Sequence, residues 1–235
     1  LARALLTEPT RPFERTLLDT LAAAPDDDVF DLFERLMTQG PVARRRDVLD
    51  AVRSRTSRMR GPRGAALVRR AADDPTLGLK PGDVAPALTS VDGAEGVRYI
   101  RARWRAASAP GVFLRNLRQV RHVSALDLAL EIAAELPDTA TGLLNELMTA
   151  LSEAPATDPA RTDPFWRRML AHPDPALRAQ AVRALGRVEH GDFAALLVPI
   201  VTDARASASL RLDALRACAE AGDAPSTETL WALAS

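Results

Sequence analysis

The chain has 235 residues, and its 31 basic and 31 acidic side chains leave no net charge at pH 7. Alanine, leucine and arginine recur throughout while aromatic residues make up only 4% of the chain, a composition that favours helices over strands. No run of 18 apolar residues is present, so the sequence excludes a membrane-spanning helix. The one cysteine, Cys218, excludes an intrachain disulfide and suits a reducing compartment, so we predict a cytoplasmic location.

The first part of the chain carries the signals of four helices. Pro12, followed by apolar residues at helical spacing, predicts the first of them. The acidic run 26–28 supplies a cap and N-terminal negative charge for a second helix, which Gly40-Pro41 ends. We expect a third helix from Val42 to about Met59, and then a break at Gly61-Pro62 before a shorter fourth helix.

Turn signals dominate residues 73–95, so we expect a loop-rich segment there that contains only a short helix at 84–88. The helix after it has an apolar stripe that includes Trp104 beside a stripe of arginines, and Pro110-Gly111 ends it. Ser124 is the expected N-cap of the helix that follows. These signals predict a helical but irregular N-terminal part.

Three prolines punctuate the polar stretch 154–164, which is either a long loop between repeats or a weak domain boundary. Beyond it a pattern recurs. Leu177-Arg178 returns as Leu210-Arg211, 33 residues later, and 181–184 aligns with 214–217. A period in this range is typical of stacked helical repeats, in which each unit is a pair of helices.

Residues 173–186, with the sequence PDPALRAQAVRALG, resemble the second helix of HEAT repeats, particularly of the bacterial HEAT-like type. The shared features are the turn at Asp174-Pro175, an aliphatic residue followed by arginine, and alanines that let helices pack closely. The second copy departs from this pattern, because 207–209 replaces the turn. The similarity is clear over 163–235. It implies an α-solenoid that binds something along its concave face, and it carries over no catalytic residue.

We therefore predict an all-α fold, an α-solenoid of stacked antiparallel helix pairs whose N-terminal part is more irregular. Residues 1–124 form a helical region of diverged repeats or of a different helical domain, which is rich in arginine from residue 42. Residues 125–235 form HEAT-like repeats, of which the last is truncated. Since the chain begins at Leu1 without a methionine and ends at Ser235 within a helical pattern, we expect it to be a fragment or a processed product.

The sequence shows no motif of a catalytic, cofactor or metal site. The three histidines, His122, His172 and His190, lack the spacing of metal ligands, and we interpret His172 and His190 as surface residues of turns. The tryptophans share helix faces with aliphatic residues, so we expect core packing rather than base stacking. We accordingly predict no catalytic residue, no cofactor and no metal ion.

Charge is segregated along the chain despite the neutral total. Residues 1–41 carry 4 basic and 8 acidic groups, 42–121 carry 18 and 7, and 122–235 carry 9 and 16. The basic middle part contains the best candidates for an interaction surface, which are Arg44, Arg45, Arg46, Arg55, Arg58, Arg98, Arg101 and Arg105. A phosphate-binding surface needs many cations on one side, whereas the other interpretation is a solvated face or pairing with the acidic repeats.

The leading functional hypothesis is a non-catalytic helical-repeat scaffold that binds a protein partner. The alternative is a nucleic-acid-binding HEAT-like protein that uses residues 42–121, with little sequence preference because phosphate contacts position without specifying. Some bacterial HEAT-like proteins are DNA glycosylases with a basic concave face, tryptophans and a catalytic aspartate. The arginines, tryptophans and aspartates of this chain do not match the spacing of that site. No membrane partner is expected.

Overall fold

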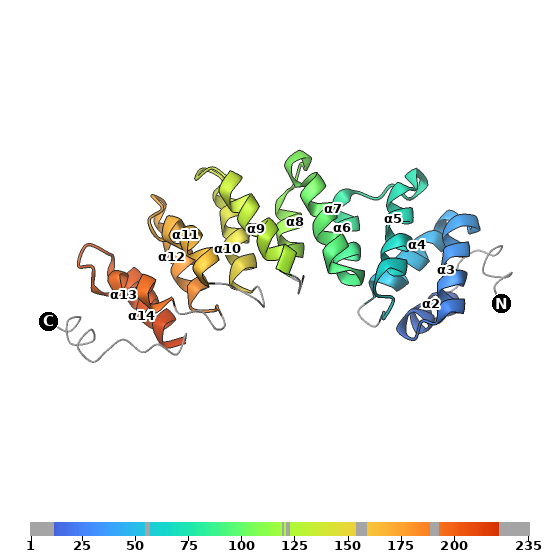
Figure 1. Cartoon of the computed structure of the whole chain (residues 1–235), viewed down its shortest axis with the longest axis horizontal. Coiled ribbons are helices and arrows are strands. Elements are labelled where there is room, and N and C mark those ends of the chain that lie inside the picture. The colour runs from blue at the N-terminus through green and yellow to red at the C-terminus, as the bar shows by residue number, and fades with distance from the viewer. Residues whose placement is uncertain are drawn as a thin grey trace. The chain divides into compact units, whose positions relative to one another are not determined.

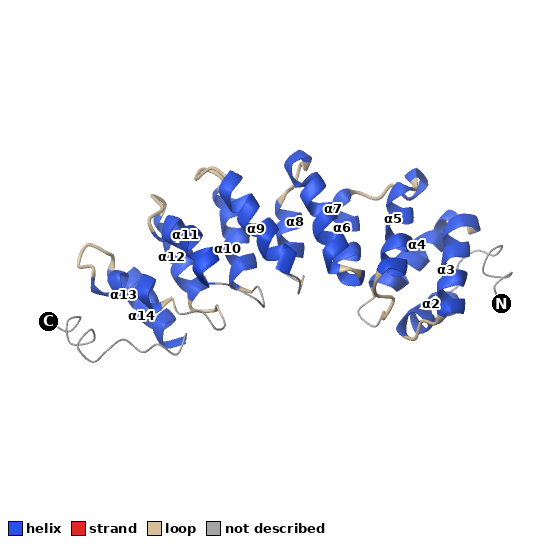
Figure 2. Ribbon diagram, viewed as in Figure 1, coloured by secondary structure: helices blue, strands red, loops and turns tan. Residues whose placement is uncertain are grey.

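The computed structural model describes residues 12–54, 57–118, 120, 123–153, 159–188 and 193–220. Every regular element in these residues is a helix, which confirms the all-helical fold class (Figure 2). The chain divides into two compact units, unit 1 at Leu1–Val120 and unit 2 at Arg121–Ser235. Each unit builds its own core from the helices described below.

Unit 1 contains seven α-helices and two short 3₁₀ turns in its described part (Figure 1). In chain order they are α2 (Pro12–Ala23), α3 (Asp27–Gln39), α4 (Val42–Arg53), α5 (Pro62–Asp73), η1 (Pro75–Leu77), α6 (Pro81–Val91), α7 (Gly93–Arg103), η2 (Trp104–Ala106) and α8 (Gly111–Leu117). Helix α4 lies in the middle of this unit, because it contacts α2, α3, α5 and α6. Helix α6 contacts α5, α7 and α8 in turn.

The predicted ends of the second helix are confirmed. Asp26 is the N-cap of α3 and accepts a hydrogen bond from the amide of Val29 at 2.8 Å, and Gly40 ends the helix. The third helix, by contrast, ends at Arg53 rather than near Met59. Beyond Arg53 the chain is held by tertiary contacts: the amide of Arg58 donates to the carbonyl of Ala22 at 2.8 Å, and Met59 is fully buried in the core. These contacts override the local helical preference of the sequence.

Residues 73–95 are mostly helical, so the prediction of a loop-rich segment was wrong. The expected turn signals instead start helices. Pro81 is the first residue of α6, where the missing amide hydrogen is tolerated. Asp92 caps α7 by accepting from the amide of Glu95 at 3.0 Å, so α6 and α7 are separated by this one residue. Helix α7 then ends at Arg103, before the predicted stop at Pro110-Gly111.

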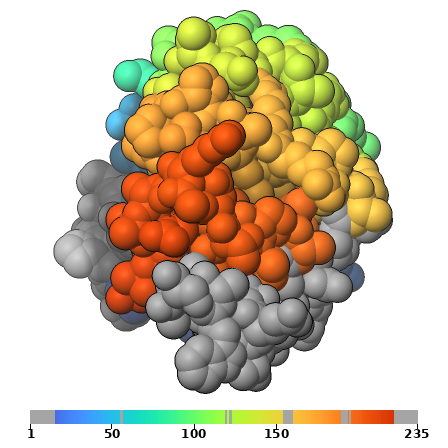
Figure 3. Space-filling view, turned by 90° about the vertical axis from the view of Figure 1, so that its left-hand side faces the viewer, coloured from blue at the N-terminus to red at the C-terminus, as the bar shows by residue number. Residues whose placement is uncertain are grey.

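Unit 2 contains six described helices, which are α9 (Val123–Glu135), α10 (Thr141–Ser152), α11 (Pro159–Leu170), α12 (Pro175–Leu185), α13 (Ala194–Thr202) and α14 (Ala208–Glu220). Helices that follow one another pack in pairs, α9 with α10, α11 with α12, and α13 with α14. The second helices of the pairs also contact one another in series, α10 with α12 and α12 with α14. In the space-filling view, the orange-red surface of the last pair lies directly against the lighter orange surface of the pair before it (Figure 3).

The helix ends of unit 2 confirm one prediction and correct two. Asp174 caps α12 by accepting from the amide of Ala176 at 2.8 Å, and Pro175 is the first helical residue. Helix α9 begins at Val123, so Ser124 lies inside it and is not its N-cap. Helix α11 begins at Pro159, so the second half of the predicted polar loop 154–164 is helical; proline is well accommodated at a first helical position.

The core of unit 2 is aliphatic and aromatic. Trp166 is fully buried and meets the rings of Phe165 and Phe193 edge-on, with centroids 5.2 and 6.4 Å apart. Cys218 is buried as a core thiol, as expected from its alanine neighbours. Trp104 in unit 1 is also buried. Base stacking on these two tryptophans would require them to leave the core, whereas Trp231 lies outside the described residues.

Two glycines provide a matched test of helix packing. A Cβ atom on Gly96 of α7 would lie 2.7 Å from the Cα atom of Thr89 on α6, whereas a Cβ on Gly142 of α10 would meet nothing within 4 Å. We expect Gly96→Ala to lower the free energy of unfolding by about 1–3 kcal/mol, because α6 and α7 must separate. Gly142→Ala should raise it by up to about 1 kcal/mol, because alanine is the better helix former. Chemical denaturation measures both, and equal stability of the two variants would contradict this packing.

Candidate functional site

The arginines expected to form an interaction surface have different environments in the structure. Arg44 is fully buried beside Asp47, with 3.8 Å between Nη1 and Oδ2. Arg45 donates from Nε to the carbonyl of Gly40 at 2.8 Å and forms an ion pair with Asp74. Because Arg44 lies in the core, its assignment to an interaction surface was wrong. Arg45 connects α4 to the turn after α5.

The other candidate arginines of residues 42–60 are Arg46, Arg55 and Arg58. Arg46 is exposed and donates from Nη2 to the carbonyl of Leu77 at 3.1 Å. Arg58 is exposed but follows the end of α4, and Arg55 lies outside the described residues. Since α4 ends at Arg53, Arg58 does not lie on the same helix as Arg44 and Arg46.

The other candidate arginines, Arg98, Arg101 and Arg105, lie on and directly after α7. Arg98 forms an ion pair with Glu95, and its side chain is 72% exposed. Arg101 is half-buried, and Arg105 is exposed with its guanidinium 4.8 Å from the centre of the Trp104 ring. Of these three arginines, Arg98 lines a hollow in the surface of unit 1.

This hollow, which we call the charged groove, has a volume of about 590 Å³ and lies between α5, the start of α6, and α7. Its charged and aromatic lining consists of Arg69, Asp73, Glu95, Arg98, Tyr99 and Arg103. Helix α7 contributes Glu95, Tyr99 and Arg103 at successive i+4 positions, which places them on one face of that helix. The sequence prediction chose the neighbouring arginine stripe of α7 and therefore missed Tyr99 and Arg103.

One carboxylate and one aromatic ring organise the cations of the charged groove. The carboxylate of Glu95 contacts Arg69 at 3.1 Å and also pairs with Arg98, and its side chain is only 13% exposed. The guanidinium of Arg103 lies over the ring of Tyr99, 4.1 Å from its centre. Burial raises the pKa of Tyr99 from its ordinary value, so the phenol keeps its proton near neutral pH. The groove therefore presents fixed guanidinium groups beside a hydroxyl donor.

A second hollow, which we call the apolar pocket, lies on the same unit and has a volume of about 470 Å³. It lies between the start of α6, at 80–83, and the segment 106–113 that leads into α8. Its lining includes three alanines together with Val112 and Phe113. Pro81 lines both the apolar pocket and the charged groove, so the two hollows adjoin at the first residue of α6.

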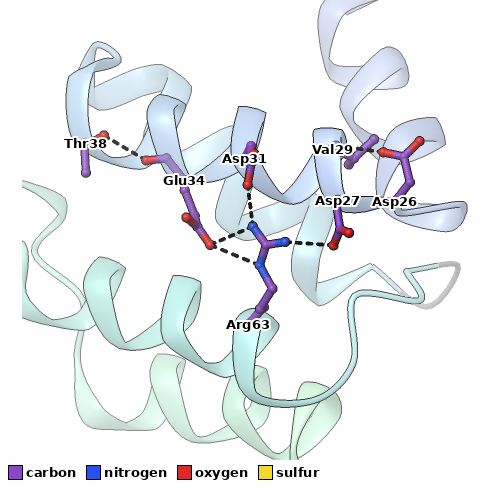
Figure 4. Close-up of polar contacts among 7 residues, drawn as sticks. All are labelled: Asp26, Asp27, Val29, Asp31, Glu34, Thr38 and Arg63. Atoms are coloured by element: carbon purple, nitrogen blue, oxygen red, sulfur yellow. Dashed lines mark hydrogen bonds and ion pairs between the residues drawn. The ribbon is translucent and has the colours of Figure 1, made fainter.

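Arg63 on α5 is surrounded by three carboxylates of α3 (Figure 4). It contacts Asp27 at 3.1 Å, Asp31 at 2.6 Å and Glu34 at 3.2 Å, and it lies over the ring of Phe30 at 4.7 Å. The hydrogen bond to Asp31 raises the pKa of Arg63 above its ordinary value. These contacts lie at the surface, and they join α3 to α5.

His172 is buried rather than exposed, so its assignment to the surface was wrong. Its Nδ1 atom accepts from the amide of Asp174 at 3.0 Å, and its Nε2 atom is 3.1 Å from the carbonyl of Asp138. Since a carbonyl can only accept, Nε2 is the donor of this contact. The side chain thus connects the turn before α12 to the link between α9 and α10. His122 and His190 lie outside the described residues.

Asp74 provides a pH-dependent test of the contact between α4 and the turn after α5. Hydrogen bonds from the hydroxyl and amide of Thr76, together with Arg45, hold the pKa of Asp74 below its ordinary value of 3.8. Its contribution to stability is therefore present above pH 3.8 and is lost as the pH falls through the lowered folded-state pKa. We expect Asp74→Asn to lower the melting temperature at neutral pH, and this difference should disappear in acid.

Melting curves of wild type, Asp74→Asn and the neighbouring Asp73→Asn, recorded across this pH range, make the comparison. Asp73 forms no ion pair with the described residues, so its variant is the control. A constant difference between wild type and Asp74→Asn at every pH would contradict the assignment of the ionised carboxylate.

Within the described ranges, no group of three or more His, Cys, Asp and Glu side chains is arranged to hold a metal ion. None of the helices described here has the length and apolar character that crossing a membrane requires. The fold and the site thus define an all-helical protein with two adjoining surface hollows on unit 1. Comparison with protein-family models, with curated proteins and with solved structures finds no match to the chain.

Proposed function

We propose that the chain is a HEAT-like α-solenoid that acts as a non-catalytic scaffold and binds a protein partner. The observation that carries this proposal is the packing of unit 2, in which helix pairs follow one another and the second helices α10, α12 and α14 contact in series. Stacked helical repeats bury their apolar faces in this way, since each pair contacts only its neighbours. The 33-residue recurrence of the sequence agrees with this spacing.

Polar contacts between the pairs support the same proposal. Arg161 on α11 contacts Asp127 on α9 at 2.5 Å, and Arg183 on α12 contacts Asp213 on α14 at 3.0 Å. These partners are 34 and 30 residues apart in sequence, which is about one repeat. Exposed ion pairs add little to stability. Each nevertheless joins corresponding helices of neighbouring pairs, the first helices in one case and the second helices in the other.

A protein partner is the occupant that this architecture favours, because helical repeats offer extended surfaces rather than one deep site. The two hollows of unit 1 are of the size used for side chains or small ligands. The buried thiol of Cys218 suits a reducing compartment, so a cytoplasmic location is part of the proposal.

Nucleic-acid binding is the second candidate, and the excess of 18 basic over 7 acidic groups in residues 42–121 favours it. Against it, Arg44 is buried and Arg45 and Arg98 are paired with carboxylates. A phosphate-binding surface needs cations that can exchange counterions for phosphates. These arginines already have protein partners, so the scaffold remains the leading proposal.

Two binding experiments separate the candidates. Labelled duplex and single-stranded DNA and RNA are titrated with the purified chain at about 50 mM salt, where phosphate contacts are strong; the scaffold proposal predicts no binding. A protein captured by the tagged chain is then purified and titrated against the chain alone, and a saturable complex is expected. Two results together would favour the second candidate over the scaffold. The first is salt-dependent nucleic-acid binding that weakens when Arg98, Arg101 and Arg105 are replaced by alanine. The second is that no purified protein partner binds.

A further inference from the structure

We infer that the charged groove and the apolar pocket together bind one extended segment of a partner protein, with an acidic side chain in the groove and an apolar side chain in the pocket. This inference rests on the proposed scaffold function, because it names the surface and the chemistry through which that scaffold would hold its partner. Its first support is the charge balance of the groove, and its second is the joining of the two hollows at Pro81.

The charged groove has more positive than negative charge. Glu95 is a single carboxylate, yet it is shared by Arg69 and Arg98, so it neutralises only one of these two cations. Arg103 is stacked on Tyr99 and forms no ion pair with a carboxylate among the described residues. The only other acidic side chain of the lining is the exposed Asp73. An acidic side chain entering the groove would therefore find an unneutralised guanidinium.

Arg103 and Tyr99 are positioned to bind a carboxylate. Stacking on Tyr99 restricts the guanidinium of Arg103, so little of its freedom is lost when a ligand binds. Arginine binds carboxylates with two parallel hydrogen bonds, and the phenol of Tyr99 is a further donor. Arg103 and Tyr99 thus form the recognition pair of the groove.

The apolar pocket explains why a polypeptide segment fits better than a nucleic acid. Its lining of alanines, Val112 and Phe113 offers no cation except Lys80, whereas a strand of phosphates needs a continuous row of them. An extended chain advances about 3.3 Å per residue and directs successive side chains to opposite sides. A segment that crosses Pro81 would therefore direct an acidic and an apolar side chain, a few positions apart, into the two hollows.

The test uses a displayed library of random peptides selected on the full chain. We expect selected peptides to be enriched in aspartate or glutamate within a few positions of a leucine, isoleucine, methionine or phenylalanine. A synthetic peptide from this set, labelled with fluorescein, is then titrated by fluorescence anisotropy. Arg103→Glu should weaken its binding by about tenfold or more, as expected for loss of a charge-assisted hydrogen bond, and Val112→Asp should weaken it as well.

Arg70→Glu is the matched control, because Arg70 is an exposed residue of α5, next to Arg69, that does not line the groove. It makes the same change of charge and should bind the peptide as wild type does. Circular dichroism shows whether each variant keeps its helices, and Tyr99→Ala gives a second variant of the groove if Arg103→Glu does not fold.

Each other outcome overturns the inference. Two of these outcomes concern the selection, which could yield no peptide or peptides enriched in basic residues. The third is peptide binding that Arg103→Glu weakens no more than Arg70→Glu does. The fourth is binding of nucleic acid that is lost in the Arg103→Glu variant. The scaffold proposal is judged separately: a purified protein partner that binds Arg103→Glu and wild type equally would remove the groove inference and leave the scaffold in place. If no protein partner binds the wild-type chain, the scaffold itself fails.

Discussion

Leu185→Asp is expected to unfold the helices of unit 2. Leu185 is fully buried at the end of α12, so the substitution places a carboxylate without a partner in the core. Such burial costs several kcal/mol, which is comparable to the total stability of a small domain. Leu177, which is 5% exposed, is the second position at which the same result is expected. Far-ultraviolet circular dichroism should show a lower helical signal at room temperature.

Leu212→Asp is the matched control for this experiment, because Leu212 on α14 is 46% exposed and undergoes the same chemical change. Its effect should stay within about 0.5 kcal/mol of wild type, as for most surface substitutions. Wild-type thermal stability of Leu185→Asp would contradict the arrangement of the α12 core.

Trp166→Ala is expected to lower the free energy of unfolding of unit 2 by about 3–5 kcal/mol. Trp166 is fully buried against Phe165 and Phe193, so its removal leaves a large cavity. The indole Nε1 has no hydrogen-bond partner among the described residues, so the loss comes from apolar packing. Urea denaturation measures it, and Trp166→Phe, which fills part of the cavity, should lose clearly less.

A Trp166→Ala variant within about 1 kcal/mol of wild type would contradict the core position of this ring, since cavities of this size are costly. It would also reopen base stacking as a role for this tryptophan. The same variant should leave the charged groove intact, because the groove is formed by α5, α6 and α7 of unit 1.

Local signals predicted those parts of the fold that depend on neighbouring residues. The caps at Asp26 and Asp174 were found from sequence, because each accepts from an amide two or three residues further on. The end of α4 was not predicted from sequence, since Met59 is buried in a core that distant helices build. The turn signals of residues 73–95 include Asp92, which caps α7, because turns and helix starts use the same residue types.

The candidate site was predicted only in part for the same reason. Arg98 was identified as a surface cation, but Arg69 and Arg103 join it only because α5, α6 and α7 pack together. His172 was assigned to the surface because it lies in a turn, yet its ring reaches the carbonyl of Asp138, 34 residues earlier. Contacts at such separations depend on how helices pack, which a single sequence does not specify.

The central claim is that one helix of a repeat stacks on the corresponding helix of the next repeat, and nuclear magnetic resonance tests it most directly. Gly186 is buried at the end of α12, and a Cβ placed on it would lie 2.9 Å from the Cβ of Ala217 on α14. In a sample with labelled alanine methyl groups, we predict a strong nuclear Overhauser effect between the Gly186 Hα protons and the Ala217 methyl group. Absence of this cross-peak, with the intrahelical cross-peaks of both residues present, would contradict the stacking of α12 on α14.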